Sequence, residues 1–183
     1  MLTFKEETRL DLSMKKVGLI SDTHIPTRAS EIPSRIFEVF QNVDFIIHAG
    51  DLVEWRVIDE LERLAPVCAV YGNMDGIGIR EELPEINVLR IYDWRIGVIH
   101  DPGVLFGVSI MREIAKEHNY DVLVHGHTHR SNIRWENRRL FINPGSPTNP
   151  IPPFIINPTI AILKLTREKI QPEIIPLEKK FRK

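Results

Sequence analysis

The sequence predicts an α/β protein built from two stacked β-sheets with helices outside them. Its first part alternates short apolar runs with amphipathic segments, as the β-α-β-α-β units of a parallel sheet do. Its second half shows pairs of apolar runs around short polar turns, which is typical of antiparallel hairpins. Two sheets accommodate both halves, and a chain of 183 residues suits a single domain spanning 1–183.

The first half begins with residues 1–15, whose alternating charges and missing apolar core predict an N-terminal extension and no signal peptide. Three apolar runs follow that read as buried strands: Val17 to Ser21, Val43 to His48 and Val67 to Tyr71. Apolar side chains at helical spacing predict the helices between them. One helix begins near Pro33 and runs through Phe40, and the other covers Glu54 to Leu64.

The second half is predicted to be mainly antiparallel. Hairpins are expected around Asp93-Trp94 and Glu136-Asn137, with a third formed by Thr159 to Thr166 and Ile170 to Ile175. A helix over Val108 to His118 and a short strand over Val122 to Val124 lie between the first two hairpins. A proline-rich loop precedes the third hairpin, and its segment Pro150 to Ile156 is apolar enough to dock on a second subunit, which makes a homo-oligomer one expected partner.

The composition narrows the function classes. A net charge of -1 gives no general attraction to nucleic acid or anionic membrane, so neither is an expected partner. The single cysteine, Cys68, excludes a disulfide within the chain and fits a cytoplasmic location. Because Cys68 lies in an apolar run, we expect a buried, inert thiol.

Metal-capable side chains follow the predicted strands at the point where each strand ends. They are Asp22, His24, Asp51, Asn73, His100, His127 and His129. The carboxyl ends of parallel strands open into one crevice, so these groups are expected to lie close together. Mixed imidazole and carboxylate ligands favour transition metals. Three oxygen donors and four imidazoles exceed one tetrahedral site, but two metal ions would each receive four ligands if Asp51 bridges them.

Taken singly, most of these features are also typical of ordinary turns. Gly50-Asp51 and Gly72-Asn73 are frequent after strands, and His100 could cap the turn that follows it. The run from His125 to His129 is different, because three histidines in five residues favour a metal site. All of the features together, in order after five strands, are not explained by turns.

This series resembles the calcineurin-like metallophosphoesterase superfamily, and in particular its small YfcE-type phosphodiesterase branch. The motifs that carry the resemblance are Ser21-Asp22-Thr23-His24, His48-Ala49-Gly50-Asp51, Gly72-Asn73-Met74-Asp75, His100, Gly126-His127-Thr128-His129 and Asn143-Pro144-Gly145-Ser146. The resemblance implies a four-layer αββα sandwich of two mixed β-sheets. It also implies hydrolysis of a small phosphate ester, most readily a diester, by water activated between two divalent metal ions.

The resemblance further implies which residues hold each ion. One ion would take Asp22, His24, Asp51 and His129, and the other would take Asp51, Asn73, His100 and His127. Asp51, Asn73 and His100 would act in catalysis. Mn²⁺ is favoured over Ni²⁺, Co²⁺, Fe²⁺ and Zn²⁺. His48 and His125 match no ligand position. His48 is expected either to pack in the interior or to contact a ligand, and His125 is expected to contact the ligands and line the site.

The sequence departs from the family pattern at two places. Met74 stands where many relatives have a histidine that assists the leaving group, which removes a general acid and leaves Asp75 without its usual partner. His125 or metal-bound water could serve instead, or the enzyme could rely on good leaving groups. Asp101 stands where relatives often have glycine, and its carboxylate would disfavour polyanions.

Two other functions compete with the enzyme. One is a protein-binding scaffold like the retromer subunit of this fold, whose metal site is degraded; here every ligand position is filled. The other is a DNA nuclease, but such relatives add domains and basic surfaces for which this chain has no room.

Overall fold

The computed structural model describes residues 13–103, 108–148 and 157–177, and these ranges hold ten strands and four helices. The strands are β1 (Lys15–Ile20), β2 (Phe45–Ala49), β3 (Val67–Val70), β4 (Ile86–Ile91), β5 (Trp94–Ile99), β6 (Val122–Val124), β7 (Asn132–Glu136), β8 (Arg139–Asn143), β9 (Thr159–Leu165) and β10 (Ile170–Pro176). The helices are α1 (Ser34–Phe40), α2 (Arg56–Glu62), α3 (Ile77–Glu82) and α4 (Val108–Glu117). Within the described residues, no helix is long and apolar enough to cross a membrane. The expected oligomer segment lies outside these ranges, as does most of the N-terminal extension.

The strands form two five-stranded sheets, both mixed. The first sheet has the order β10-β9-β1-β2-β3, in which β1, β2 and β3 are parallel. The second sheet has the order β4-β5-β6-β8-β7, in which β5, β6 and β8 are parallel. The expectation that the second half is mainly antiparallel is therefore wrong for the middle of the second sheet. The chain crosses from β6 to the outer strand β7 before β8 returns beside β6, and nothing in the hairpin pattern signals that return.

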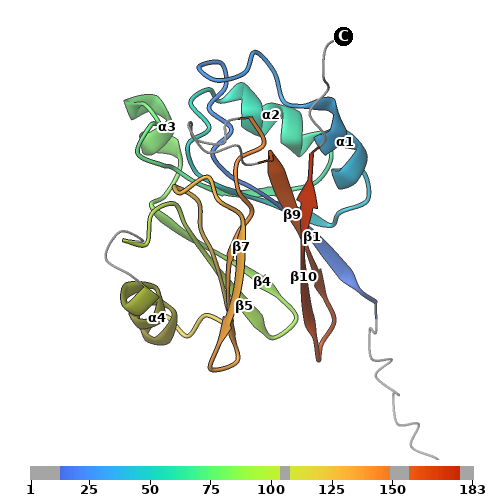
Figure 1. The fold of residues 1–183 in the computed structure, drawn as a ribbon, viewed down its shortest axis with the longest axis vertical. Helices are drawn as coiled ribbons and strands as arrows, with labels where there is room; N and C mark the ends of the chain where they lie inside the picture. The colour runs from blue at the N-terminus through green and yellow to red at the C-terminus, as the bar shows by residue number, and fades with distance from the viewer. Residues whose placement is uncertain (1–12, 104–107, 149–156, 178–183) are drawn as a thin grey trace, which may run out of the picture.

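The two sheets pack face to face and helices cover their outer faces. Val17 and Leu19 of β1 and Ile47 of β2 meet Ile96 and Val98 of β5 in one buried apolar cluster. A second cluster joins the other face of the first sheet to α1, α2 and α3, and a third joins the second sheet to α4. Figure 1 shows α1 and α2 together on one side of the molecule and α4 on the opposite side. The four-layer αββα sandwich is thus confirmed.

Glycine lets an aromatic ring lie directly on each sheet. A Cβ at Gly18 of β1 would lie 2.8 Å from the ring of Phe40, the last residue of α1. A Cβ at Gly97 of β5 would lie 2.4 Å from the ring of Tyr120, which follows α4. Any larger residue at either position would push the covering layer away from its sheet.

Local details differ from the sequence predictions. The first hairpin turns at Tyr92 and Asp93, because Tyr92 adopts a left-handed backbone, and Trp94 already belongs to β5. The second turns at Asn137 and Arg138, both left-handed. Helix α2 begins two residues later and ends two residues earlier than predicted, a difference that is common at helix termini. Helix α3 was not predicted.

Candidate metal centre

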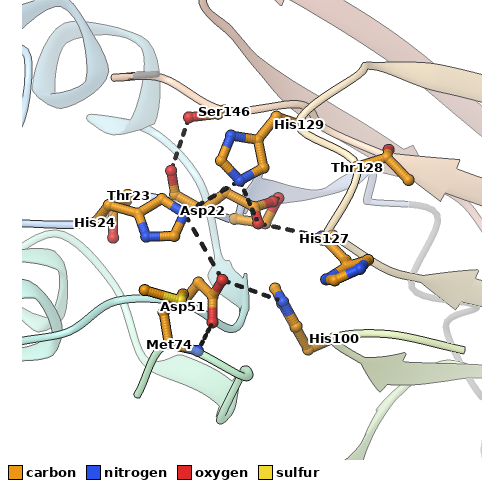
Figure 2. A network of polar contacts seen from close by, with 12 residues as sticks. Asp22, Thr23, His24, Asp51, Met74, His100, His127, Thr128, His129 and Ser146 are labelled. Atoms are coloured by element: carbon orange, nitrogen blue, oxygen red, sulfur yellow. Dashed lines mark hydrogen bonds and ion pairs between the residues drawn. The ribbon is translucent and has the colours of Figure 1, made fainter. Parts of the chain in front are cut away.

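The carboxyl ends of the parallel strands meet at one edge of the sandwich, where all seven predicted ligands lie. Asp22 and His24 follow β1, Asp51 follows β2 and Asn73 follows β3. His100 follows β5, and His127 and His129 follow β6 of the second sheet. Figure 2 shows Asp22, His24 and Asp51 facing His100, His127 and His129 across the junction of the sheets. The structure therefore brings together the side chains that the strand ends predicted.

Asp22, His24 and His129 form a first buried cluster. The two imidazoles face each other, with Nε2 of His24 3.1 Å from Nε2 of His129. Nε2 of His129 also lies 3.3 Å from Oδ1 of Asp22. Two imidazole nitrogens and a carboxylate oxygen that converge in this way have the donor chemistry that a borderline transition metal prefers. These three residues could hold one metal ion.

Asn73, His100 and His127 form a second cluster beside the first. Oδ1 of Asn73 lies 3.1 Å from Nε2 of His100 and 2.9 Å from Nδ1 of His127. The other ring nitrogen of His100, Nδ1, lies 2.8 Å from the carbonyl oxygen of Ala49, which fixes the ring so that Nε2 points inward. Nε2 of His127 is 3.6 Å from the carboxylate of Asp101.

Asp51 lies between the two clusters. Its Oδ2 is 3.7 Å from Nε2 of His24 and 3.3 Å from Nε2 of His100. Its Oδ1 accepts a hydrogen bond of 2.7 Å from the amide of Met74. Asp22, Asp51 and His100 are also close enough to hold an ion, a group that crosses the two sets implied by the resemblance. One carboxylate oxygen thus faces an imidazole of each cluster.

The backbone of the candidate ligands is unusual, because five of these seven residues adopt positive φ. Those five are Asp22, His24, Asp51, His127 and His129, with φ between 46 and 69 degrees. Such a conformation costs an L-residue about 1 kcal/mol. Hydrogen bonds between the loops help to hold it: the amide of Asp22 donates to Gly50 (2.9 Å) and that of His24 to Asp51 (3.0 Å). Strain concentrated at one edge is typical of functional sites.

Buried hydroxyl and amide groups support the ligand loops, and sequence reasoning assigned them no role. Oγ of Ser21 donates to Oδ2 of Asp22 (2.6 Å), and Oγ of Ser146 donates to the carbonyl oxygen of Asp22 (2.7 Å). The side-chain amide of Asn143 donates to the carbonyl oxygen of Gly126 (2.7 Å). The only signal was that these residues stand in motifs of the resemblance.

Asp75 lacks the histidine that is its usual partner in the family, but its carboxylate has three hydrogen-bond partners in the backbone. Its carboxylate accepts hydrogen bonds from the amides of Asp51 (2.9 Å), Val53 (2.6 Å) and Gly72 (2.7 Å). Asp75 therefore ties the loop after β2 to the loop after β3. Although position 74 has no histidine, the Asp75 carboxylate is fully engaged in hydrogen bonds with backbone amides.

Burial and charge shift the pKa values of the ligands in different directions. Burial tends to lower the pKa of His100, but its hydrogen bond to Asp51 and the charges of Asp22 and Asp51 outweigh burial and raise this pKa to about 9. Burial also tends to raise the pKa of Asp51, yet the contact with His100 lowers it. Burial lowers the pKa of His24 to about 4 and raises that of Asp22.

The two remaining motif histidines are buried and neutral. Burial lowers the pKa of His48 to about 3 and that of His125 to about 4. Nε2 of His48 lies 3.1 Å from Oγ1 of Thr23, the residue between the candidate ligands Asp22 and His24 in the sequence. The ring of His125 contacts the Gly126 carbonyl and the Asn143 amide, both at 3.4 Å. Cys68, which was expected to be buried, is only partly buried, but desolvation still raises the pKa of its thiol to about 11, in keeping with an inert side chain.

A cavity of about 330 Å³ opens beside the second cluster. Asn73 and His100 form its inner wall, and Tyr71, Arg80, Glu85 and Asp101 are among its other lining residues. The cavity is at the lower end of the size range of small-molecule sites. It gives a small ligand access to the metal-capable groups.

The chain is similar to known proteins over most of its length. The chain is 44% identical over 161 residues to a protein of Methanothermobacter thermautotrophicus named "Probable metallophosphoesterase", covering 87% of this chain and 91% of that protein. It is 36% identical over 172 residues to a phosphodiesterase of Methanocaldococcus jannaschii, covering 87% of this chain and 98% of that protein. Vacuolar protein sorting 29 of Cryptosporidium parvum shares the fold, with a TM-score of 0.75 at 23% identity over 91% of this chain and 99% of that one.

The family model described as the calcineurin-like phosphoesterase superfamily domain matches residues 14–168. That range contains every ligand candidate and both sheets except β10. Because this model covers most of the chain and the relatives are up to 44% identical to it, the chain belongs to the calcineurin-like phosphoesterase superfamily.

Proposed function

We propose that this protein is a phosphodiesterase that depends on two divalent metal ions held by the seven strand-end ligands. The observation that carries the proposal is the position of Asp51, whose Oδ2 faces His24 on one side and His100 on the other. A carboxylate between two sets of donors is suited to bridge two ions.

The proposed ligand sets follow the two clusters. One ion is held by Asp22, His24, Asp51 and His129, and the other by Asp51, Asn73, His100 and His127. The first set is more deeply buried, since its four side chains are all buried, whereas Asn73 is exposed and His127 is partly exposed. The second ion is therefore the one beside the cavity and the substrate.

A bound pair of divalent ions supplies water of lowered pKa and neutralises the charge of phosphate oxygens. The chain supplies orientation. Asn73 lies at the cavity wall, where its amide can donate to a phosphate oxygen while Oδ1 faces the metal site. His100 holds Nε2 toward Asp51 through its contact with Ala49. These contacts would hold Asn73 and His100 in place beside a bound phosphate ester.

The leaving group receives little help from side chains. Met74, which is 55% exposed, has no proton to give. His125, with a pKa of about 4, is neutral at pH 7 and is a poor general acid. We therefore favour substrates whose leaving alcohol departs without strong protonation, and a diester over a monoester dianion.

The cavity mouth favours a small substrate of low charge. Asp101 and Glu85 line the cavity with Asn73 and His100, and both carry carboxylates. These two carboxylates outnumber the single guanidinium of the lining, that of Arg80, and so disfavour a polyanion. The mixed imidazole and carboxylate ligands admit several transition metals, and we favour Mn²⁺ among them.

The test is hydrolysis of bis-p-nitrophenyl phosphate and p-nitrophenyl phosphate by chelator-stripped protein after each metal is restored. Turnover that returns with Mn²⁺ and is faster on the diester supports the proposal. His127→Ala should abolish it. His118→Ala is the matched control, because His118 is an exposed imidazole that stacks on Tyr120 away from the site, and it should leave turnover unchanged.

A protein-binding scaffold is the second candidate, and one surface favours it. Trp55 is 40% exposed beside a hollow formed with α3, and Ile77 on α3 is 76% exposed. Exposed apolar side chains of this size are typical of interaction sites. Folded protein that shows no turnover with any metal would favour this function over the enzyme.

A further inference from the structure

The turn formed by Gly72, Asn73, Met74 and Asp75 touches the candidate metal centre in three ways. Asn73 contributes Oδ1 to the second cluster, and the amide of Met74 donates to Oδ1 of Asp51. Gly72 lies against the same carboxylate, since a Cβ there would be 2.2 Å from Oδ1 of Asp51. A displacement of this turn would therefore move both Asn73 and Asp51.

Two charged side chains hold this turn by its backbone. The Asp75 carboxylate accepts hydrogen bonds from the amide of Gly72 in the turn and from the amides of Asp51 and Val53 in the loop after β2. Asp75 is 4% exposed, and these amides supply the donors that a buried carboxylate needs. Asp75 thus fixes the distance between the turn and Asp51.

Arg80 donates hydrogen bonds to carbonyl oxygens of the turn. Its Nη2 donates to Asn73 (2.9 Å) and to Gly72 (3.2 Å), and its Nε donates to Asp75 (2.8 Å). Arg80 belongs to α3, which the buried side chain of Ile79 anchors to the apolar core. The guanidinium lies 5.2 Å from the centre of the Tyr71 ring, which limits its movement.

We propose that Asp75 and Arg80 are positioning residues for the second metal ion, one holding the amides and the other the carbonyls of the Gly72–Asp75 turn. This inference rests on the proposed two-ion centre. Position 74 has no histidine, so Asp75 serves the backbone. Arg80, which lies outside every motif, is the partner that completes the support. Both side chains contact the backbone of a proposed ligand: Asp75 accepts from the amide of Asp51, and Arg80 donates to the carbonyl oxygen of Asn73.

The experiment is titration calorimetry of chelator-stripped protein with Mn²⁺. The variants are Arg80→Ala, Arg80→Lys and Asp75→Asn. The matched control is Arg167→Ala, because Arg167 also lies over a tyrosine ring, that of Tyr92 at 4.9 Å, but far along the chain from the turn. Circular dichroism and melting temperature establish that each variant is folded. Arg80 is exposed, so its variants keep the test open if Asp75→Asn does not fold.

We expect two binding events in the unmodified protein. In Arg80→Ala one event weakens by about tenfold or more, while the other stays within about twofold. Arg80→Lys recovers part of the loss, since an ammonium can reach one carbonyl but cannot span three. Asp75→Asn weakens the same event, and Arg167→Ala changes neither.

Two results would overturn this inference and spare the proposed function: two events that Arg80→Ala leaves unchanged, or two events that it weakens equally. Unchanged Mn²⁺ binding with a raised KM in Arg80→Ala would also overturn it, because Arg80 would then act on substrate directly. A single event in the unmodified protein would contradict the two-ion centre itself.

Discussion

At the scale of single residues, the proposed two-ion centre depends most on Asp51. Its carboxylate is almost fully buried, and Oδ2 faces imidazoles from both sheets. Replacing it by a neutral amide of the same shape would remove one bridging charge with little change in packing. The effect on metal binding and turnover therefore isolates the charge.

We predict that Asp51→Asn lowers kcat/KM by more than about a hundredfold, the upper end of the loss expected for residues that only support a metal ligand. Asp44→Asn is the control, because Asp44 precedes the same strand at its far end and contacts Lys15 at 2.9 Å. Turnover of bis-p-nitrophenyl phosphate measures both. Near-normal turnover in Asp51→Asn would show that Asp51 does not bridge.

Met74 allows a test of the missing general acid. We predict that Met74→His keeps or raises activity on esters with poor leaving groups, by up to about a hundredfold on a phenyl relative to a p-nitrophenyl diester. The reason is that an exposed imidazole at this position could donate a proton to the leaving oxygen. Met74→Gln serves as the control. A large loss on the poor leaving group in Met74→His would argue against this explanation.

His100 predicts how metal affinity depends on pH. Without metal its pKa is about 9, so it is protonated at pH 7 and must lose a proton to bind an ion. Apparent Mn²⁺ affinity should therefore rise as pH rises toward 9, with a limit of about tenfold per pH unit for one displaced proton. His24, with a pKa of about 4, adds no slope there. Calorimetry at several pH values between about 7 and 8.5 measures the slope, and a flat profile would contradict the assignment.

At the scale of elements, the turn after β3 shows how closely backbone and ligands are packed. We predict that Gly72→Ala disrupts metal binding, because its Cβ would need the space of the Asp51 carboxylate. Gly78→Ala is the control, since it lies in α3 with nothing near its Cβ, and it should raise the free energy of unfolding by about 0.5–1 kcal/mol. Chemical denaturation and Mn²⁺ titration test the pair. Normal metal binding in Gly72→Ala would mean that the turn can move without cost.

The elements also show what the sequence could and could not predict. Apolar runs such as Val17 to Ser21 predicted the buried strands, because burial on both faces leaves no polar alternation to confuse the pattern. Helix α3 was missed because its six residues include Gly78 and have no side-chain cap. The parallel return of β8 was missed because hairpin signals report neighbours in sequence and not the order of strands in a sheet.

The sequence predicted the ligand candidates but not the residues and loops that hold them in place. Each of the seven ligand candidates lies in a loop that follows a strand, and the carboxyl ends of parallel strands meet at one edge, so the sequence predicted that these residues lie close together. Arg80 could not be predicted, because its role depends on carbonyl oxygens that any sequence provides and on a helix without a sequence signal. The left-handed backbone of residues such as Asp22 and His129 is likewise imposed by the loops that hold them.

At the scale of the whole molecule, the proposed ions would join the two sheets. Asp22, His24, Asp51 and Asn73 come from the first sheet, while His100, His127 and His129 come from the second. The apolar cluster between the sheets is extensive without them, so the metal-free protein should still fold. Binding should then add stability according to how far the ion concentration exceeds Kd.

We predict that Mn²⁺ at about 100 times Kd raises the free energy of unfolding by about 2.7 kcal/mol for each ion that binds only the folded state. A chelator should reverse the effect. Urea denaturation with and without Mn²⁺ measures it, and Asp51→Asn should show a smaller increase than Asp44→Asn. Equal increases in the two variants would mean that the stabilising ion binds elsewhere.

The most direct test of the two-ion centre is a crystal structure of the Mn²⁺-loaded protein with anomalous scattering recorded at the manganese edge. The account predicts two peaks about 3.5–4 Å apart, with the carboxylate of Asp51 between them. One peak should lie among Asp22, His24 and His129, and the other among Asn73, His100 and His127. A single peak, or two peaks that Asp51 does not join, would contradict it.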